Sequence, residues 1–190
     1  MWTNTNDLAD PSQMRLDPLR MRDDSRLAQL LGGIFGELNA DPKYPSMELL
    51  PLYDIAARNL HDLGRFEQAV ELLEQVFKIK DITLTEDHPD RLASQHELAS
   101  AYLSNGLIKQ AVVLMEKVVE IENTTLAEDH PNRLASQHEL ARAYQSNGQV
   151  KLAVKLLEQV VEIEKITLAE DHPDRLISQY KLDQLIQASV

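Results

Sequence analysis

Three histidines recur in the same setting, each between an aspartate and a proline. His88, His130 and His172 follow one another at intervals of 42 residues. An imidazole beside a carboxylate can bind a metal ion or transfer a proton. Zinc is held by bonds of about 2 Å, so side chains one structural repeat apart are too distant to share an ion. We therefore expect each histidine to cap a helix that begins at the following proline, and we predict no metal site and no cofactor.

A second pair of histidines, His96 and His138, has the same spacing of 42 residues. These imidazoles could act as general acids or bases, with Glu97 and Asp54 as the carboxylates available to orient His96. They could also line a binding surface, or face solvent without a function. Residue types leave these interpretations open, and we assign no catalytic residue.

The composition excludes several kinds of chemistry and partner. The 190 residues include no cysteine, which excludes disulfides, thiolate metal sites and a cysteine nucleophile. The 19 basic and 31 acidic residues give a net charge of −12, which opposes binding to nucleic acid and to acidic membranes. No apolar stretch approaches the roughly 20 residues of a membrane span. We expect a cytoplasmic protein that binds neither nucleic acid nor membrane.

The spacing of the histidines reflects an internal repeat. Residues 84–125 and 126–167 are identical at 30 of 42 positions, and the start of the unit returns from Asp171. A diverged copy lies upstream, where Ala56 to Val76 align with Leu98 to Val118. Such self-similarity predicts a stack of structural repeats. The expected units are residues 45–86, 87–128 and 129–170, followed by a capping helix at 171–190.

Each unit has the pattern of two helices. Proline suits the first position of a helix because no amide donor is needed there, and Asn-Gly suits the left-handed turn that ends one. Apolar residues three and four positions apart follow in both halves of the unit. The predicted all-α structure has helices at 49–62, 66–81, 90–104, 108–124, 132–146, 150–166 and 174–188.

The apolar stripes also predict which side chains are buried. Leu140 should lie in the core, and so should the rings of Tyr102 and Tyr144. Alanines at 99, 111, 141 and 153 should let neighbouring helices approach closely. The glutamates of the second helices, such as Glu162, are expected on a solvated outer face. Gly106 and Gly148 should adopt positive φ, which glycine tolerates best.

The two ends of the chain differ from the repeats. Residues 1–24 are rich in Asn, Asp, Arg and Met without periodicity, and we expect a flexible N-terminal tail. Residues 25–44 would cap the first repeat, with a helix weakened by glycines. Near the other end, Asp183 stands where the earlier units have alanine, which predicts a last helix with a more polar outer side.

The pattern within one unit resembles the tetratricopeptide repeat. The residues that carry the resemblance are Leu98, Ala99, Tyr102, Gly106, Ala111, Met115 and Val118. The 42-residue unit with its Asp-His-Pro joint is similar to the longer repeats of kinesin light chains, and the near-identical copies are similar to repeat arrays of NLR-type signalling proteins. The resemblance covers residues 44–190. It implies a right-handed α-solenoid whose first helices line a concave groove that binds peptide segments.

The resemblance further implies which side chains face that groove. They stand four, eight and eleven residues after the leucine near the start of each first helix. In this chain they are Asp54, Arg58, His61, His96, Ser100, Leu103, His138, Arg142, Gln145, Tyr180, Gln184 and Gln187. The two arginines favour an acidic or mixed peptide, since a guanidinium pairs well with carboxylates. The imidazoles would make binding respond to pH near 6 to 7, roughly where histidine titrates.

These observations predict a protein-interaction module, either a scaffold or a sensor and assembly arm. Its partner would be a protein or peptide, and self-association through the solenoid ends is a further possibility. The alternative is a small enzyme or small-molecule-binding protein on the same solenoid, with His96, His138, Asp54 or Arg142 doing acid–base work. An enzyme would require a water-excluding pocket with converging polar groups, whereas an interaction module requires only an open groove.

Overall fold

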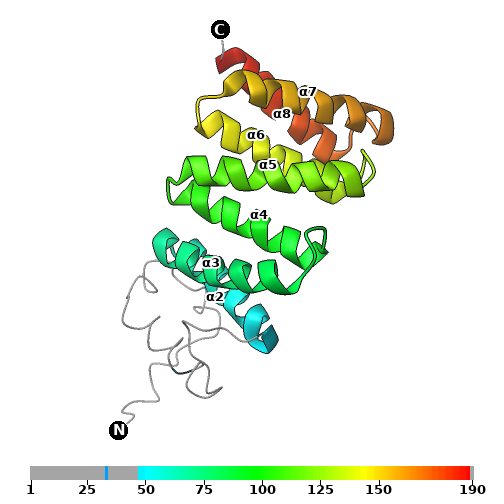
Figure 1. Ribbon diagram of the computed structural model, residues 1–190. Coiled ribbons are helices and arrows are strands. Elements are labelled where there is room, and N and C mark those ends of the chain that lie inside the picture. Colours follow the sequence, from blue (N-terminus) through cyan, green and yellow to red (C-terminus); the bar gives the residue numbers. More distant parts are fainter. Residues whose placement is uncertain (1–32, 34–46, 189–190) are drawn as a thin grey trace, which may run out of the picture.

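The computed structural model describes Gly33 and residues 47–188, and these residues form a stack of helices with no β-strand among them (Figure 1). A short turn, η1 (Met47–Leu49), leads into the first pair. The pairs are α2 (Leu50–Asp62) with α3 (Phe66–Thr83), α4 (Pro89–Ser104) with α5 (Ile108–Thr125), and α6 (Pro131–Ser146) with α7 (Val150–Thr167), followed by α8 (Pro173–Ala188). The bounds lie within two residues of the predicted ones, so the expected all-α solenoid is confirmed. The predicted tail lies outside the described residues. So does the predicted N-terminal cap, with the exception of Gly33.

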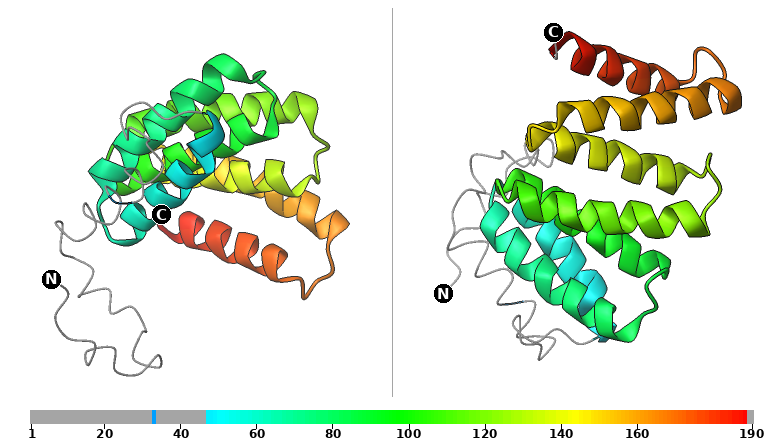
Figure 2. Two further views of the ribbon diagram at one scale, coloured as in Figure 1. Left: turned by 90° about the horizontal axis from the view of Figure 1, so that it is seen from below. Right: turned by 45° about the horizontal axis from the view of Figure 1, so that its top comes forward.

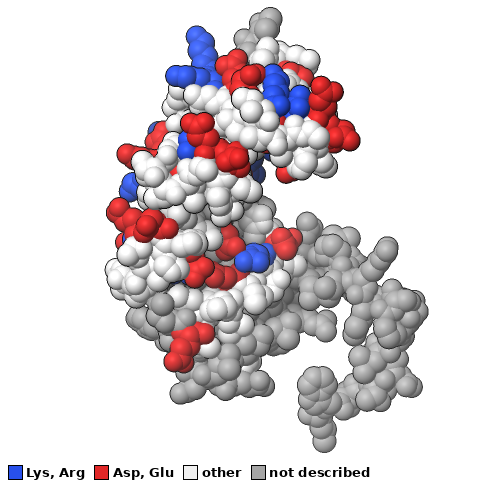
Figure 3. Space-filling view, turned by 90° about the vertical axis from the view of Figure 1, so that its right-hand side faces the viewer, with Lys and Arg blue, Asp and Glu red and all other residues white. Residues whose placement is uncertain are grey.

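The helices are stacked in the order of the chain, and each packs against the next (Figure 2). The first helices α4 and α6 also pack directly against each other, more extensively than any two second helices do. Because the first helices approach one another more closely, the stack curves toward them. The described surface is accordingly hollowed on one side (Figure 3).

The Asp-His-Pro joints start the first helices as expected. Pro89 is the first residue of α4, and the Nδ1 atom of His88 accepts a hydrogen bond from the backbone N–H of Asp90 at 3.1 Å. His130 accepts from the N–H of Asn132 at 3.2 Å in the next repeat. This contact satisfies one of the amides that a helix start leaves unpaired. The predicted capping role of these histidines is therefore confirmed.

The turns between paired helices use glycine in the left-handed conformation. Gly106 and Gly148 both have φ of 76°, which confirms the prediction. The turn closes α4 with a hydrogen bond from the N–H of Leu107 to the carbonyl of Tyr102 at 2.8 Å. This arrangement satisfies carbonyls at the helix end and reverses the chain within a few residues.

In α4, α6 and α8, an arginine links the helix to the end of the helix that precedes it in the chain. The Nη1 atom of Arg133 donates to the carbonyls of Leu126 and Asn123 at 3.0 and 3.3 Å, at the end of α5. Arg91 and Arg175 make the equivalent bond to the carbonyls of Leu84 and Leu168, both at 3.1 Å. A cation at a helix C-terminus also interacts favourably with the helix dipole. These joints were not anticipated from the sequence.

The core follows the apolar stripes. Leu140 is 4% exposed, which confirms its predicted burial, and it packs with Met115 and Val118 of the preceding repeat. The alanines at positions 99, 111, 141 and 153 are buried. In such close-packed interfaces, even a small change in side-chain volume alters stability.

Two expectations about burial were wrong in part. Tyr102 and Tyr144 are only half-buried, because their hydroxyls reach out to donate to Glu74 and Glu116 of the preceding second helix, both at 2.8 Å. The last helix exposes Asp183 and other polar side chains, but its outer side is mixed rather than polar. It exposes the apolar side chains of Leu176, Ile177, Tyr180 and Ile186.

Candidate binding groove and inter-repeat pocket

Polar side chains join successive first helices on the inner side of the curve. Arg58 of α2 donates to Glu97 of α4 at 2.8 Å. One helix further, Arg142 of α6 donates to Ser100 of α4 at 3.2 Å and also to Glu139 on its own helix. Both arginines therefore already have a carboxylate partner within the chain. The structure thus brings together Ser100 and Arg142, two of the predicted groove residues.

His61 forms a third link between first helices. Its Nε2 atom lies 2.8 Å from the hydroxyl of Ser104, which donates its own proton to the carbonyl of Ser100 at 3.1 Å. The imidazole must therefore be the donor in this contact. Leu103, the neighbour of Ser104, is half-buried. This pair helps to fix the position of α2 against α4.

The remaining predicted groove residues lie at the surface. Gln145 and Gln187 are exposed. Tyr180 is 63% exposed, and its hydroxyl accepts a hydrogen bond from Gln184 at 2.6 Å. These side chains can reach a ligand without a rearrangement of the core.

Two predicted groove residues instead turn inward. Asp54 forms an ion pair with Lys80 of α3 at 3.1 Å, with only 17% and 11% of the two side chains exposed. His138 lies 2.7 Å from the hydroxyl of Ser178 on α8. Both side chains fasten helices together, so neither is free to meet a ligand in the groove.

Burial, together with the positive charge of the nearby Lys181, lowers the pKa of His138 to about 4. The hydrogen-bond pattern explains this direction. Ser178 donates to the carbonyl of Asp174 at 3.0 Å, so His138 donates through Nε2 and leaves Nδ1 unprotonated. Nδ1 is buried without a partner, and a proton added there would have no acceptor. The expected response to pH near 6 to 7 is therefore wrong for this imidazole.

Three buried charged residues stand at equivalent positions of the second helices and were not predicted from the sequence. Lys80, Glu122 and Glu164 stand 42 residues apart and are 9%, 4% and 2% exposed. The expectation that the glutamates of the second helices are solvated is therefore wrong for Glu122 and Glu164, although Glu162 is exposed. A signal was available, because Glu122 stands four residues after Val118 on the apolar stripe of its helix.

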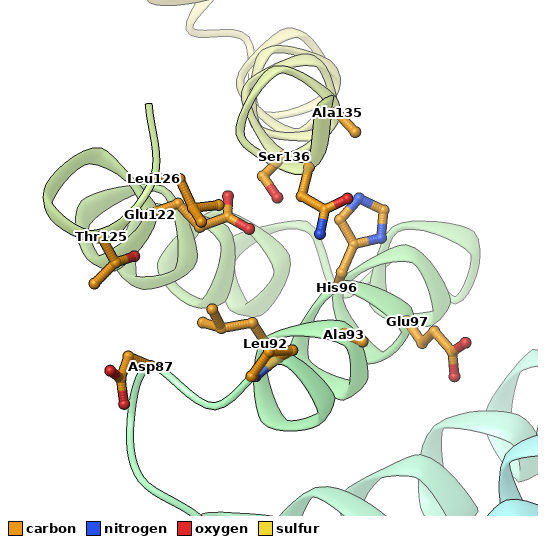
Figure 4. A pocket seen from close by; sticks show the side chains of 12 residues that line it. Asp87, Leu92, Ala93, His96, Glu97, Glu122, Thr125, Leu126, Ala135 and Ser136 are labelled. Atoms are coloured by element: carbon orange, nitrogen blue, oxygen red, sulfur yellow. The ribbon is translucent and has the colours of Figure 1, made fainter. Parts of the chain in front are cut away.

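Glu122 lines a pocket between α4, α5 and α6 with a volume of about 480 Å³. The carboxylate of Glu122, the hydroxyl of Ser136 and the ring of His96 point into the same space (Figure 4). Burial raises the pKa of Glu122, although a hydrogen bond from Ser136 opposes that shift. Of the predicted groove residues, His96 is the one that lines this pocket.

Within the described part of the chain, no three histidine or acidic side chains are grouped closely enough to hold a metal ion. Nor is any helix of that part long and apolar enough to cross a membrane. Among the described residues, no hydrogen bond joins His96 to Ser136 or to Glu122, as a nucleophile–base pair would require.

Comparison with known proteins supports the repeat architecture. The family model for the tetratricopeptide repeat matches residues 50–124 and 98–165. Among solved structures, a kinesin-light-chain-like protein from Podosopora anserina with nearly identical TPR-like repeats is 45% identical, with a TM-score of 0.73 over 90% of this chain and 83% of that one. BtubC from P. vanneervenii shares the fold at 20% identity, with a TM-score of 0.66 over 79% of this chain and 58% of that one.

Curated relatives match over shorter stretches. Nephrocystin-3 from Xenopus laevis is 35% identical over 69 residues, which is 36% of this chain and 5% of that protein. Nephrocystin-3 from Homo sapiens is 40% identical over 55 residues, which is 29% of this chain and 4% of that protein. The chain thus corresponds to a small part of these relatives.

Proposed function

The chain belongs to the tetratricopeptide repeat family, and on that premise we propose that it is an interaction module that binds a segment of a partner protein along the inner face of α2, α4, α6 and α8. Tetratricopeptide repeats generally mediate contacts between proteins. The proposal adds to that general role a place on the molecule and a kind of ligand.

The observation that carries the proposal is the environment of Arg142. Its guanidinium bridges α4 and α6 on the inner side of the curve, while 49% of the side chain stays exposed. Both hydrogen bonds leave from Nη2, so the donors on Nη1 and Nε have no partner among the described residues. A guanidinium held in this way is ready to bind a carboxylate of a passing peptide.

The character of the ligand follows from the charges around the groove. Arg58 and Arg142 are each paired with a glutamate, so the inner face is not strongly positive. A segment with both carboxylates and cationic groups fits this pattern better than a purely acidic one. Salt should weaken its binding.

The test uses site-specific photocrosslinking of the full chain in lysate of the native cell. A benzophenone amino acid replaces Gln145 on the inner face in one sample and Glu162 on the outer face in another. We expect a partner to be captured from position 145 and not from position 162. Adding Arg142→Glu should reduce the capture, because it replaces the free donors with a carboxylate.

The matched control is Lys165→Glu on the outer face, which makes the same charge change away from the groove. It should leave the capture at position 145 unchanged. Capture from position 162 alone, insensitive to Arg142→Glu, would show that the outer face is the working surface and would overturn the proposal.

A further inference from the structure

The three repeats contain three versions of one interior polar site. In each, a side chain of the first helix faces one of the second helix, and a serine of the next first helix completes the site. The first repeat pairs Asp54 with Lys80, so a carboxylate and an ammonium of the chain form an ion pair at 3.1 Å. In the third repeat, the His138 ring donates to Ser178 at 2.7 Å, and Lys181 supplies a nearby positive charge.

In the middle version, a hydrogen bond from Ser136 reaches Glu122, and no ion pair or hydrogen bond joins Glu122 to His96 among the described residues. Glu122 occupies the place of Lys80, and His96 the place of Asp54. One carboxylate oxygen of Glu122, Oε2, is buried and accepts no hydrogen bond among the described residues. Asp54 Oδ1 and Glu164 Oε2 are also buried and unpaired, but of these three carboxylates Glu122 is the one that lines the pocket between α4, α5 and α6. A buried acceptor without a donor is costly, and more so if it carries charge.

The surroundings of Glu122 favour a positive ligand. The lining residues that the structure describes include Asp87 and Glu97 but neither lysine nor arginine. Arg133 and His130 lie close enough for their charges to lower the pKa of Glu122, but the Nη1 atom of Arg133 donates to backbone carbonyls at the end of α5. The whole chain carries a net charge of −12, which adds to the attraction for cations.

We propose that the pocket between α4, α5 and α6 binds the ammonium group of a lysine side chain from the partner segment, with Glu122 as its counter-ion. This inference rests on the proposed function, because the lysine is supplied by a segment bound along the inner face. An ammonium has three donors, and the pocket offers it acceptors on Glu122, Ser136 and His96. The ion pair of Asp54 and Lys80 is the same chemistry, formed within the chain one repeat earlier.

A lysine fits the pocket better than an arginine does. The acceptors come from three different helices and surround a space, whereas a guanidinium prefers a planar, bidentate partner. The pocket also has apolar walls, formed by Leu92, Ala93, Leu126 and Ala135. The methylene stem of a lysine can lie along such walls while its charged end reaches Glu122.

The experiment titrates the full chain with the capped tripeptide acetyl-Ala-Lys-Ala-amide. The methyl signals of Leu92 and Leu126 in NMR spectra report on the pocket directly. We expect saturable shifts of these signals, and an affinity lower by about tenfold or more in Glu122→Gln, which keeps the shape but removes the charge. The same tripeptide with norleucine, which lacks the ammonium, should not bind.

Two further variants separate loss of the site from loss of the fold. Glu164→Gln removes the equivalent carboxylate where His138 and Ser178 close the site, and it should leave the affinity unchanged. The double variant His96→Asp with Glu122→Lys rebuilds the ion pair of the first repeat in the middle one. It should fold normally, which circular dichroism can verify, and should no longer bind the lysine tripeptide.

Several results would overturn the proposal. Equal binding of the norleucine tripeptide, or equal affinity in Glu122→Gln, would show that the carboxylate does not recognise the ligand. Shifts with free cadaverine but none with the lysine tripeptide would make the pocket a site for small amines instead. A partner captured at position 145 by wild-type protein and equally by Glu122→Gln would leave the interaction module intact and remove the lysine site alone.

Discussion

Replacing His138 by glutamine should remove much of the acid sensitivity of the fold. In the native protein the pKa of this imidazole is about 4, whereas in the unfolded chain it returns to its ordinary value of 6.5. Between these values the unfolded state binds a proton that the native state does not. Stability is therefore fully present above pH 6.5 and is lost as the pH falls toward 4.

The size of the effect follows from the difference between the two pKa values. At pH 5 the loss relative to pH 7.5 would be about 2 kcal/mol if the whole shift counted, and about 1 kcal/mol after allowance for partial solvent exposure of the ring. In His138→Gln, the amide can still donate to Ser178 but does not titrate. The stability difference between wild type and variant should therefore shrink by this amount between pH 7.5 and pH 5.

Urea unfolding at several pH values measures this difference, since the titration of all other groups cancels between the two proteins. Lys181→Gln is a useful companion, because removing that charge should raise the pKa of His138 and reduce the acid loss of wild type. Parallel pH profiles for wild type and His138→Gln would refute the reasoning, because they would mean that His138 has the same pKa in both states.

Three further predictions concern stability at neutral pH. Leu140→Ala should lower the free energy of unfolding by roughly 2 to 5 kcal/mol, through lost burial and the cavity left behind. Glu162→Ala should change it by less than about 0.5 kcal/mol. Equal urea midpoints for the two variants would show that the assignment of Leu140 to the core and Glu162 to the outer face is wrong. Gly148→Ala should cost about 1 kcal/mol, from the left-handed backbone alone, because no atom lies within 4 Å of an added Cβ. Lys80→Met should cost about 2 kcal/mol by stranding the carboxylate of Asp54, and Asp54→Asn in the same chain should restore part of that loss; a double variant no more stable than Lys80→Met would contradict it.

The fold could be predicted from the sequence because the repeat supplies the same evidence several times. Each first helix has a proline at or next to its start, each turn within a pair has its Asn-Gly or Gly, and each stripe has its 3.6-residue period. The positive φ of Gly148 follows from local backbone preference, which the residue type itself determines. The burial of Leu140 follows from its place on a stripe. None of these inferences depends on contacts between distant side chains.

The site could be predicted less well, because the direction of a polar side chain depends on its neighbours in space. Asp54 and His138 stand at groove positions by sequence number, yet the first turns to Lys80 and the second to Ser178. Those partners lie 26 and 40 residues away. Glu122 was assigned to the outer face because glutamates usually are exposed, although its position on the apolar stripe indicated otherwise. A charged residue on such a stripe predicts an interior polar site.

The contacts between neighbours have a genetic consequence. Every extensive helix contact joins elements that are adjacent in the chain or one element apart, such as α4 with α6. Removing 42 residues from one joint to the next would therefore bring α3 directly before α6, across the same capping histidine and clamping arginine. Recombination between the near-identical copies can lengthen or shorten the array by whole units without creating a new kind of interface. Such an exchange would change the order and number of the interior polar sites. It would therefore change the number of pockets that can bind a lysine of the partner segment.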